Sequence, residues 1–598
     1  MHDSSKRRPI RMLLVHEAAA VVNTVRAEAG VWGTLAWALV VLVVVTLPAA
    51  GAWGSVLGNP LGETGNHLWM FWRSVEHLQG RTGVLGNVPI GVDIPLMDPV
   101  NLPAYWVGSW WGPAVGWRTM VVWNVCLAML GGYLLARQWT GADGARVAMV
   151  ASGAMPFLGG VIDFGISESW PLGWFALHTA ALVTFGRTGR WRWAWSAGLC
   201  LGAVALSGWY HAFYGLLWDA MLVPVLWVQF RRAGLILQGF IGAGMVMPFL
   251  WSFLQVRGQW EPRWRLPSPG PPGPRPDWGE LPVFGVDLLT YLLPHPSVVS
   301  PSKATYLGVV VLLLAGVAVV RVPRKVLGVL LMAAPFLLLG LGYWPTVAGT
   351  AVGASGPAKW LVDAVPALMG MSHWFRAVGP AAVLIAVAAG VGAGCLAQRS
   401  SRWSHALAIC VLADSLYGAP TAWPKAVFAL GGPPSIEVLA GQGGIIQLPF
   451  DNGRTPFSDE PPRIYQRWQV AHGRPIAENY EGVDALLAYS ELVASVDAAC
   501  LVSSTLPPYY KPPPEMRGLG TPSAKRGRLM ADALSDAGFE WIILHRDRCP
   551  VTVTPIRALT KVLGPGIELP GGDRAWPLDE ALRAPTEAIL ESFARQEQ

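Results

Sequence analysis

Charged residues are scarce in this chain, and that scarcity limits the class of protein to which it can belong. They account for 14% of the 598 residues, while hydrophobic residues account for 53%. Soluble domains carry about 25% charged residues, so the composition excludes an ordinary water-soluble protein. The net charge of +6 is dispersed over short gaps between apolar runs and forms no basic face. We therefore expect no nucleic-acid partner.

Several signatures of soluble enzymes are also missing. The chain has no CxxC pair, so a zinc or thioredoxin-like site lacks support. It has no Walker loop and no GxGxxG motif, so nucleotide binding lacks support as well. Of only six cysteines, four lie in apolar runs, where cysteine acts as a small buried residue. Cys500 and Cys549 lie in a polar region, where they form a disulfide if that region is extracytoplasmic, and are otherwise two free thiols.

What the chain does contain is a series of long apolar runs. About eleven runs of bilayer-spanning length fill residues 32–417. Short Arg/Lys clusters occupy every second gap, and the positive-inside rule places those gaps in the cytoplasm. The other gaps face outward and include two long loops, 52–117 and 257–305. The sequence thus predicts an α-helical polytopic membrane protein in the lipid bilayer. Residues 1–31 form a cytoplasmic segment, and the first run is an uncleaved anchor rather than a cleaved signal peptide.

The C-terminal part, residues 418–598, has a different composition. The segments 443–450 and 539–547 read as short buried strands, and stretches between them show the pattern of helices. We therefore expect a small soluble α/β domain. An odd number of spans places this domain outside the cytoplasm, but losing the weak last span, near 405–417, would reverse its side.

The first outward loop carries the best candidate for chemistry. Glu63 and His67 are four residues apart, so on a helix they share one face. A carboxylate beside an imidazole can relay a proton or bind a metal. Asp93 and Asp98 follow in the same loop, and either could join Glu63 in holding a divalent cation such as Mg²⁺ or Mn²⁺. The plainer alternative is a solvated loop with ordinary acidic residues.

Further candidates lie at the other outward gaps. Arg376 opens a late apolar run and suits a lipid phosphate. The alternative is that its side chain only extends to the membrane surface and binds no ligand. Arg257 belongs to a cluster of arginines and tryptophans that could bind phosphate, or could be plain surface loop. Glu168 and His211 fall at the outer ends of apolar runs, where we expect them to line the rim of a substrate pocket.

The order of these motifs resembles a known family. Gly62-Glu63 followed by His67-Leu68-Trp69 is similar to a first-loop pattern of Gly-Asp, a polar residue, Leu and Trp. Further similarities are GVDIPLMDPVNL, SESWPLGW, SGWYHAFYG, DLLTYLLPHP and FRAVGPAAVL, and in the C-terminal part IIQLPF and GFEWIILHRDR. The chain resembles the GT-C superfamily of polytopic membrane glycosyltransferases, and most closely a bacterial branch of it.

The resemblance implies a function at the outer face of the bacterial inner (plasma) membrane. It implies transfer of a sugar from a polyprenyl-phosphate donor to an acceptor of the cell envelope, which could be a glycan, a lipid or a protein. It also implies that the first-loop acid, here Glu63, is the catalytic base, assisted by His67. The family usually has Asp at this position, and Glu keeps the carboxylate but adds a methylene. Arg376, with Arg257, would then bind the donor phosphate.

Two functions from other classes remain open at this stage. A non-catalytic protein could transport or present a lipid-linked glycan, but a transporter usually shows inverted repeats with polar groups near the midplane. The chain shows no convincing repeat, and its polar groups gather toward one face. A membrane-anchored sensor would instead act through its C-terminal part.

Overall fold

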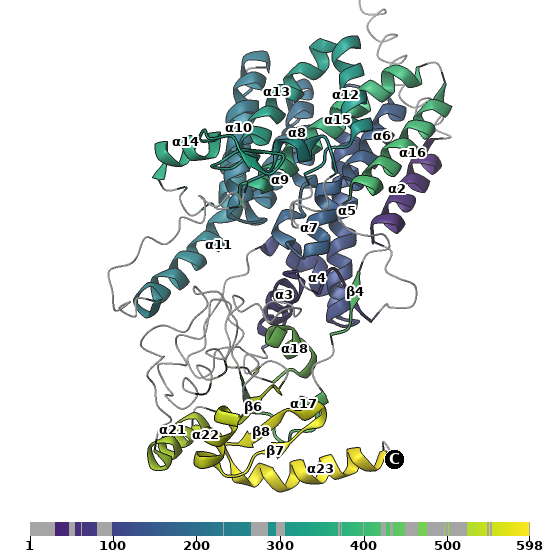
Figure 1. Cartoon of the computed structure of the whole chain (residues 1–598). Helices are drawn as coiled ribbons and strands as arrows, with labels where there is room; N and C mark the ends of the chain where they lie inside the picture. The colour runs from purple at the N-terminus through teal and green to yellow at the C-terminus, as the bar shows by residue number, and fades with distance from the viewer. Residues whose placement is uncertain are drawn as a thin grey trace, which may run out of the picture.

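The computed structural model shows a bundle of helices with a small sheet beyond one end (Figure 1). The structure describes residues 30–46, 54–60, 62–80, 98–230, 232–264, 285–294, 305–366, 368, 371, 373–398, 400–419, 426–430, 434–448, 464–474, 476, 496, 500, 523–536, 538–546, 549 and 553–596. Of the predicted cytoplasmic segment 1–31, the structure describes only residues 30 and 31.

The bundle consists of the apolar runs that the sequence predicts as spans. Its helices are α2 (Gly30–Thr46), α5 (Pro113–Ala136), α6 (Ala142–Gly153), α7 (Pro156–Phe164), α8 (Gly173–Thr188), α9 (Trp191–Leu206), α10 (Trp209–Phe230), α11 (Gly234–Trp264), α12 (Val309–Arg321), α13 (Pro323–Gly340), α15 (Val378–Ala397) and α16 (Ser401–Gly418). Shorter helices lie between them: α3 (Thr64–Leu78), α4 (Leu102–Ser109) and α14 (Pro357–Ala364).

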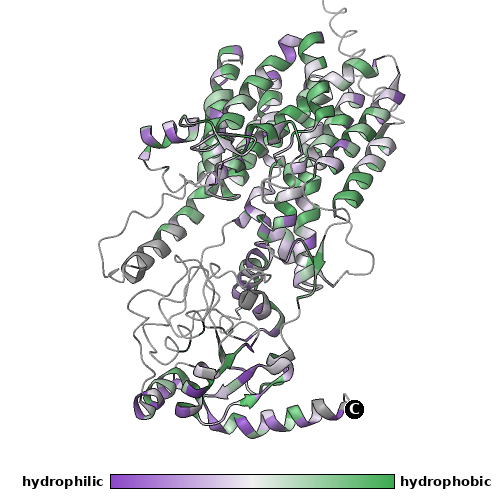
Figure 2. Cartoon of the chain, viewed as in Figure 1, coloured by the Kyte–Doolittle hydropathy of each residue, from purple (hydrophilic) through white to green (hydrophobic). Residues whose placement is uncertain are grey.

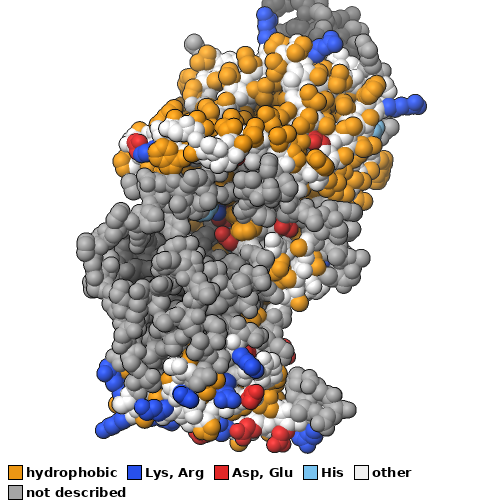
Figure 3. All heavy atoms as spheres, viewed as in Figure 1, with side chains coloured by type: hydrophobic (Ala, Val, Ile, Leu, Met, Phe, Trp, Pro, Cys, Tyr) orange, Lys and Arg blue, Asp and Glu red, His pale blue; other side chains and the backbone are white. Residues whose placement is uncertain are grey.

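Six helical segments of the described chain are long and apolar enough to cross a membrane. They are Pro113–Ala136, Ala142–Phe164, Trp209–Phe230, Gly234–Ser252, Pro323–Gly340 and Trp374–Ala397, and the shorter Val31–Thr46 and Val309–Arg321 are also apolar. Hydrophobic side chains cover the flank of the bundle, whereas charged ones lie mostly at its ends and on the C-terminal part (Figures 2 and 3). Phe240 and Val320 are 71% and 80% exposed. Such apolar exposure fits a lipid environment.

Helix α15 forms the centre of the bundle. Nearly all of its side chains are buried, and it packs against α5, α6, α12 and α13. Close packing depends on small residues, because a Cβ at Gly392 would lie 1.9 Å from the carbonyl oxygen of Leu314 on α12. Small residues at helix contacts are typical of membrane bundles, where packing rather than hydrophobic burial drives association.

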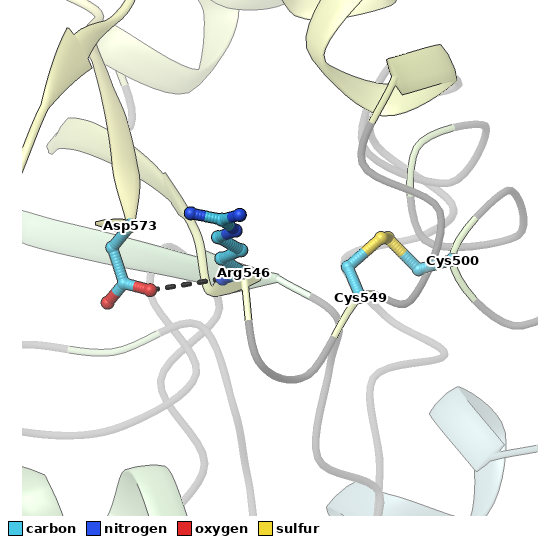
Figure 4. Close-up of a disulfide and its surroundings, with 4 residues drawn as sticks. All are labelled: Cys500, Arg546, Cys549 and Asp573. Carbon is cyan, nitrogen blue, oxygen red and sulfur yellow. Dashed lines mark hydrogen bonds between the residues drawn. A yellow bond between two sulfur atoms is a disulfide. The ribbon is translucent and has the colours of Figure 1, made fainter. Parts of the chain in front are cut away.

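The C-terminal part contains a four-stranded sheet in the order β5-β6-β8-β7. Its strands are β5 (Gly444–Leu448), β6 (Phe539–Leu544), β7 (Ile567–Glu568) and β8 (Arg574–Pro577), and the helices nearby are α17 (Pro434–Glu437), α21 (Ala524–Asp536), α22 (Val553–Leu563) and α23 (Arg583–Gln596). Strands β5 and β6 pair in parallel and lie within the two segments expected to form strands. A disulfide joins Cys500 to Cys549, close to Arg546, whose backbone N–H donates to Asp573 at 3.0 Å (Figure 4).

Two contacts attach the C-terminal part to the first outward loop. Strand β1 (Val56–Leu57) pairs with β4 (Val427–Phe428) in an antiparallel ladder. Helix α18 (Ile464–His472) packs against α3, and the indole N–H of Trp69 donates to Gln469 Oε1 at 2.6 Å. Segments hundreds of residues apart therefore support the same loop.

The structure corrects two details of the sequence reading and adds a third. The segment 209–214 occupies an outward gap between two apolar runs, which predicts a turn, but it forms the start of α10. The chain reverses just before it, where Gly208 has a φ of 140°. Helix α11 continues to Trp264, so the backbone of Arg257 is helical and not part of a long loop. Asp414, an unexpected acid in α16, accepts hydrogen bonds from the Tyr306 hydroxyl and the Val310 N–H, which explains its place beside the start of α12.

Candidate functional site

Glu63 stands at the start of α3, where tight backbone packing holds it. Its N–H donates to the carbonyl oxygen of Phe164 at 2.7 Å, at the end of α7. The preceding residue must be glycine, because a Cβ at Gly62 would lie 2.5 Å from that same oxygen. The side chain of Glu63 remains 41% exposed. The carboxylate is therefore fixed at its base and accessible at its tip.

His67 lies between two carboxylates, one from α3 and one from the η4 turn (Ser167–Ser169). Its Nε2 is 3.3 Å from Glu63 Oε2, and its Nδ1 is 3.4 Å from Glu168 Oε2. Nδ1 also lies 2.8 Å from the Ser167 hydroxyl. The His67 side chain is only 1% exposed, so protein groups and not water decide its charge.

Arg376 extends this row of charges. It lies in the short helix η10 (Trp374–Ala377) just before α15, and its NH1 is 2.7 Å from Glu168 Oε1. The guanidinium also stacks over the ring of Tyr210, with Cζ 4.6 Å from the ring centre. Its Nε is buried and has no hydrogen-bond partner within the part of the chain that the structure describes. Glu63, His67, Glu168 and Arg376 thus form one continuous series of alternating charges.

Asp98 lies behind this series and is fully buried. Its Oδ2 accepts a hydrogen bond from Asn101 Nδ2 at 3.1 Å. Asn101 also donates to the carbonyl oxygen of Ser167 at 3.3 Å and accepts from Asn124 at 2.8 Å. These amides join the η4 turn to α5 and fix the wall behind His67.

The four ionisable groups outside the spans have strongly shifted pKa values. Burial raises the pKa of Glu63, but the hydrogen bond and positive charge of His67 outweigh it and lower that pKa to about 2. Burial opposes the charged form of His67, but Glu168 and Glu63 outweigh it and raise its pKa. Burial likewise raises the pKa of Glu168, and Arg376 outweighs it, so the net shift is downward. Burial raises the pKa of Asp98 to about 7.

At neutral pH the site therefore holds Glu63 and Glu168 as carboxylates, and the raised pKa of His67 favours its imidazolium form. Asp98 is about half protonated there. The positive charges of His67 and Arg376 balance the two carboxylates, so the arrangement tolerates burial.

Two of the spans show which residues lie at which end of the bundle. The span Ala142–Phe164 ends at the residue that accepts the Glu63 N–H. The span Trp374–Ala397 begins with the turn that contains Arg376. Each has at least 23 residues, or about 35 Å of helix. Glu63 and Arg376 therefore lie together at one end, and the basic turn before Ala142 lies at the other.

Not every candidate residue reaches this site. Glu63, His67, Asp98, Glu168 and Arg376 come together, while Asp93 and the side chain of Arg257 lie outside the described residues. His211 is fully buried, and among the described residues neither of its ring nitrogens has a hydrogen-bond partner. It lies close enough to interact electrostatically with Arg376 and Glu168. It is thus inside the wall of the site rather than at an open rim.

The proposed metal ligands have other partners. Among the described residues, no group of three or more His, Cys, Asp or Glu side chains is arranged to hold a metal ion. Glu63 faces His67, and Asp98 accepts from an amide.

Sequence reasoning missed some residues of the site. The Tyr210 hydroxyl accepts the N–H of His373 at 3.1 Å, so it connects α10 to the segment before Arg376. Reading 209–214 as a turn hid this role, because Tyr210 meets Arg376 only in the folded bundle. Ser167 carried no comparable signal, because its role depends on a packing contact with α3.

Comparisons with known proteins give structural similarity alone. No family model matches the chain, and no curated protein matches its sequence. The structure is similar to apo ArnT from Cupriavidus metallidurans, with 12% identity over 93% of this chain and 99% of that chain and a TM-score of 0.49. It is also similar to the apo oligosaccharyltransferase of Archaeoglobus fulgidus, with 10% identity over 86% of this chain and 70% of that chain and a TM-score of 0.45.

A third similar structure is ArnT from Cupriavidus metallidurans bound to undecaprenyl phosphate, with 14% identity over 93% of this chain and 99% of that chain and a TM-score of 0.42. All three are membrane glycosyltransferases of the GT-C superfamily. TM-scores below 0.5 do not establish what this chain does, so its own residues must supply that evidence.

Proposed function

We propose that this protein is an inverting membrane glycosyltransferase, which moves a sugar from a polyprenyl-phosphate donor to an extracytoplasmic acceptor of the cell envelope. The observation that supports it most is the row Glu63, His67, Glu168 and Arg376 at one end of an apolar bundle. An accessible carboxylate and a buried guanidinium share one site there. Those are the groups needed to deprotonate an acceptor and to stabilise a leaving phosphate.

The proposal includes a topology in the bacterial inner membrane. About eleven spans, counting the shorter helices of the bundle, place the N-terminus in the cytoplasm and the C-terminal α/β domain outside. The catalytic end then faces outward, opposite the basic turns. The disulfide of the C-terminal part supports this side, since disulfides persist in oxidising compartments.

In the proposed reaction, Glu63 accepts the proton of the acceptor hydroxyl. The hydroxyl oxygen forms a bond to the anomeric carbon, and the bond from that carbon to the phosphate oxygen breaks, with its electron pair leaving on the phosphate. A carboxylate with a pKa of about 2 is a weak base at rest. It suffices here because an attacking hydroxyl becomes strongly acidic as its new bond forms. His67 keeps Glu63 ionised and oriented.

Arg376 is the proposed partner of the leaving phosphate. Its ion pair with Glu168 uses part of the guanidinium, which has five N–H donors in a fixed plane. The stacking on Tyr210 fixes the plane of the guanidinium, and Nε, which has no partner among the described residues, remains able to donate. The ion pair therefore orients Arg376, and the phosphate meets donors that are already placed.

The test is transfer by the variant Glu63→Gln, which keeps the shape of the side chain but removes its charge. We expect transfer to fall by at least about 100-fold, the usual contribution of a general base. Glu76→Gln, on the same helix α3, is the matched control and should stay active. An unimpaired Glu63→Gln enzyme would reject the assignment of the base, and loss of folding in both variants would show as a lower unfolding temperature.

A further inference from the structure

A cavity with basic side chains in its lining lies at the opposite end of the bundle from Glu63. It has a volume of about 400 Å³ and lies where the α5–α6 turn, the α12–α13 turn and the end of α15 meet. The residues that matter most for its chemistry are Arg137, Trp139, Asp143, Lys325, Val391 and Cys395. Neither the proposed reaction nor the resemblance gives this cavity a role.

The cavity carries an excess of positive charge. Arg137 and Lys325 line it from different turns, and both side chains are exposed. Neither forms an ion pair within the part of the chain that the structure describes. The one acidic side chain in the lining, Asp143, is already neutralised by Arg146 at 2.9 Å. The positive charges of Arg137 and Lys325 therefore both face this cavity without a neutralising partner among the described residues.

The remaining lining distinguishes a lipid from a free anion. Val391 and the half-buried Trp139 give the cavity an apolar wall, and Val391 belongs to α15, which packs against α6 and α12. A free phosphate would gain nothing from that wall, whereas a phospholipid can place its headgroup on the cations and its chain along apolar surface. Basic pockets between membrane helices bind anionic headgroups in this way.

We propose that this cavity binds the phosphate headgroup of an anionic phospholipid of the cytoplasmic leaflet. Arg137 and Lys325 contact the phosphate, and Trp139 and Val391 contact the upper part of an acyl chain. The site is separated from Glu63 by the length of the span Ala142–Phe164. It is independent of the proposed reaction and can be tested without a sugar donor.

The test measures lipid retention by the full-length protein. Protein purified from nanodiscs that contain phosphatidylcholine and phosphatidylglycerol is examined by native mass spectrometry for bound phosphatidylglycerol. We expect the double variant Arg137→Ala/Lys325→Ala to bind it about 30-fold more weakly, since each cation near a lipid surface contributes about fivefold. Arg324→Ala, which removes a charge next to the cavity but outside its lining, should retain wild-type binding, as should Arg137→Lys/Lys325→Arg.

Cys395 supplies a second measurement within the cavity. It is half-buried and belongs to the lining of the cavity. We expect phosphatidylglycerol, but not 10 mM inorganic phosphate in phosphatidylcholine nanodiscs, to slow alkylation of Cys395. Equal lipid retention by the double variant and Arg324→Ala would overturn the site. Protection of Cys395 by inorganic phosphate alone would overturn the assignment to a lipid.

Discussion

Asp98 gives a prediction whose magnitude follows from the structure. Its carboxyl group is fully buried, and burial raises its pKa from 3.8 to about 7. An unfolded chain would keep the ordinary pKa, so the folded protein binds the extra proton between those two values. The resulting stabilisation is complete below about pH 4 and is lost as the pH rises through about 7. Because one pKa unit corresponds to about 1.4 kcal/mol, the full loss is about 4 kcal/mol.

The substitution Asp98→Asn removes this titration with little change in size. The amide oxygen can still accept the hydrogen bond from Asn101, which is 3.1 Å long in the wild type. We expect the thermal unfolding midpoint of the wild type in detergent to fall between pH 5 and pH 8, and that of the variant to fall clearly less. The same pH dependence in both proteins would refute the reasoning that burial holds a proton on Asp98.

Three further predictions follow from single contacts. Glu168→Ala leaves the buried Arg376 without its ion pair, so we expect a loss of about 3–5 kcal/mol in the free energy of unfolding; an unchanged unfolding midpoint would contradict the pairing. Gln469→Ala removes the acceptor of the buried Trp69 indole N–H, at a cost of about 1–3 kcal/mol. The variant should therefore show faster proteolysis of the C-terminal part, and cleavage at the wild-type rate would show that this hydrogen bond does not attach that part to α3. Treatment with EDTA should leave sugar transfer intact, because Asp98 is buried and partly protonated, and a loss restored by Mg²⁺ or Mn²⁺ would establish a metal requirement.

The sequence predicted the helical bundle well because apolar runs report directly on membrane helices. It also indicated which groups share an end of the bundle. Alternating basic gaps assign each loop to a side, and Glu63, Glu168 and Arg376 all fall in gaps of the other kind. Once each loop is assigned to a side of the membrane, close packing of the spans is enough to predict that these residues lie near one another.

Other features could not be read from the chain. Strands β1 and β4 have two residues each, which is too short for any periodic pattern. The ion pair between Glu168 and Arg376 depends on how α8 and α15 pack, and no local signal reports it. The resulting correction is chemical: Arg376 is not a lone cation that awaits a phosphate, but one whose direction a neighbouring carboxylate already fixes.

The most direct test of the central claim is release of polyprenyl phosphate from a polyprenyl-phosphate sugar by purified protein, with envelope extract as the source of acceptor. We expect release by the wild type and by Glu76→Gln, and almost none by Glu63→Gln or Arg376→Ala. Folded Glu63→Gln and Arg376→Ala proteins that release the lipid at the wild-type rate would contradict the claim that this carboxylate and this guanidinium form one catalytic centre.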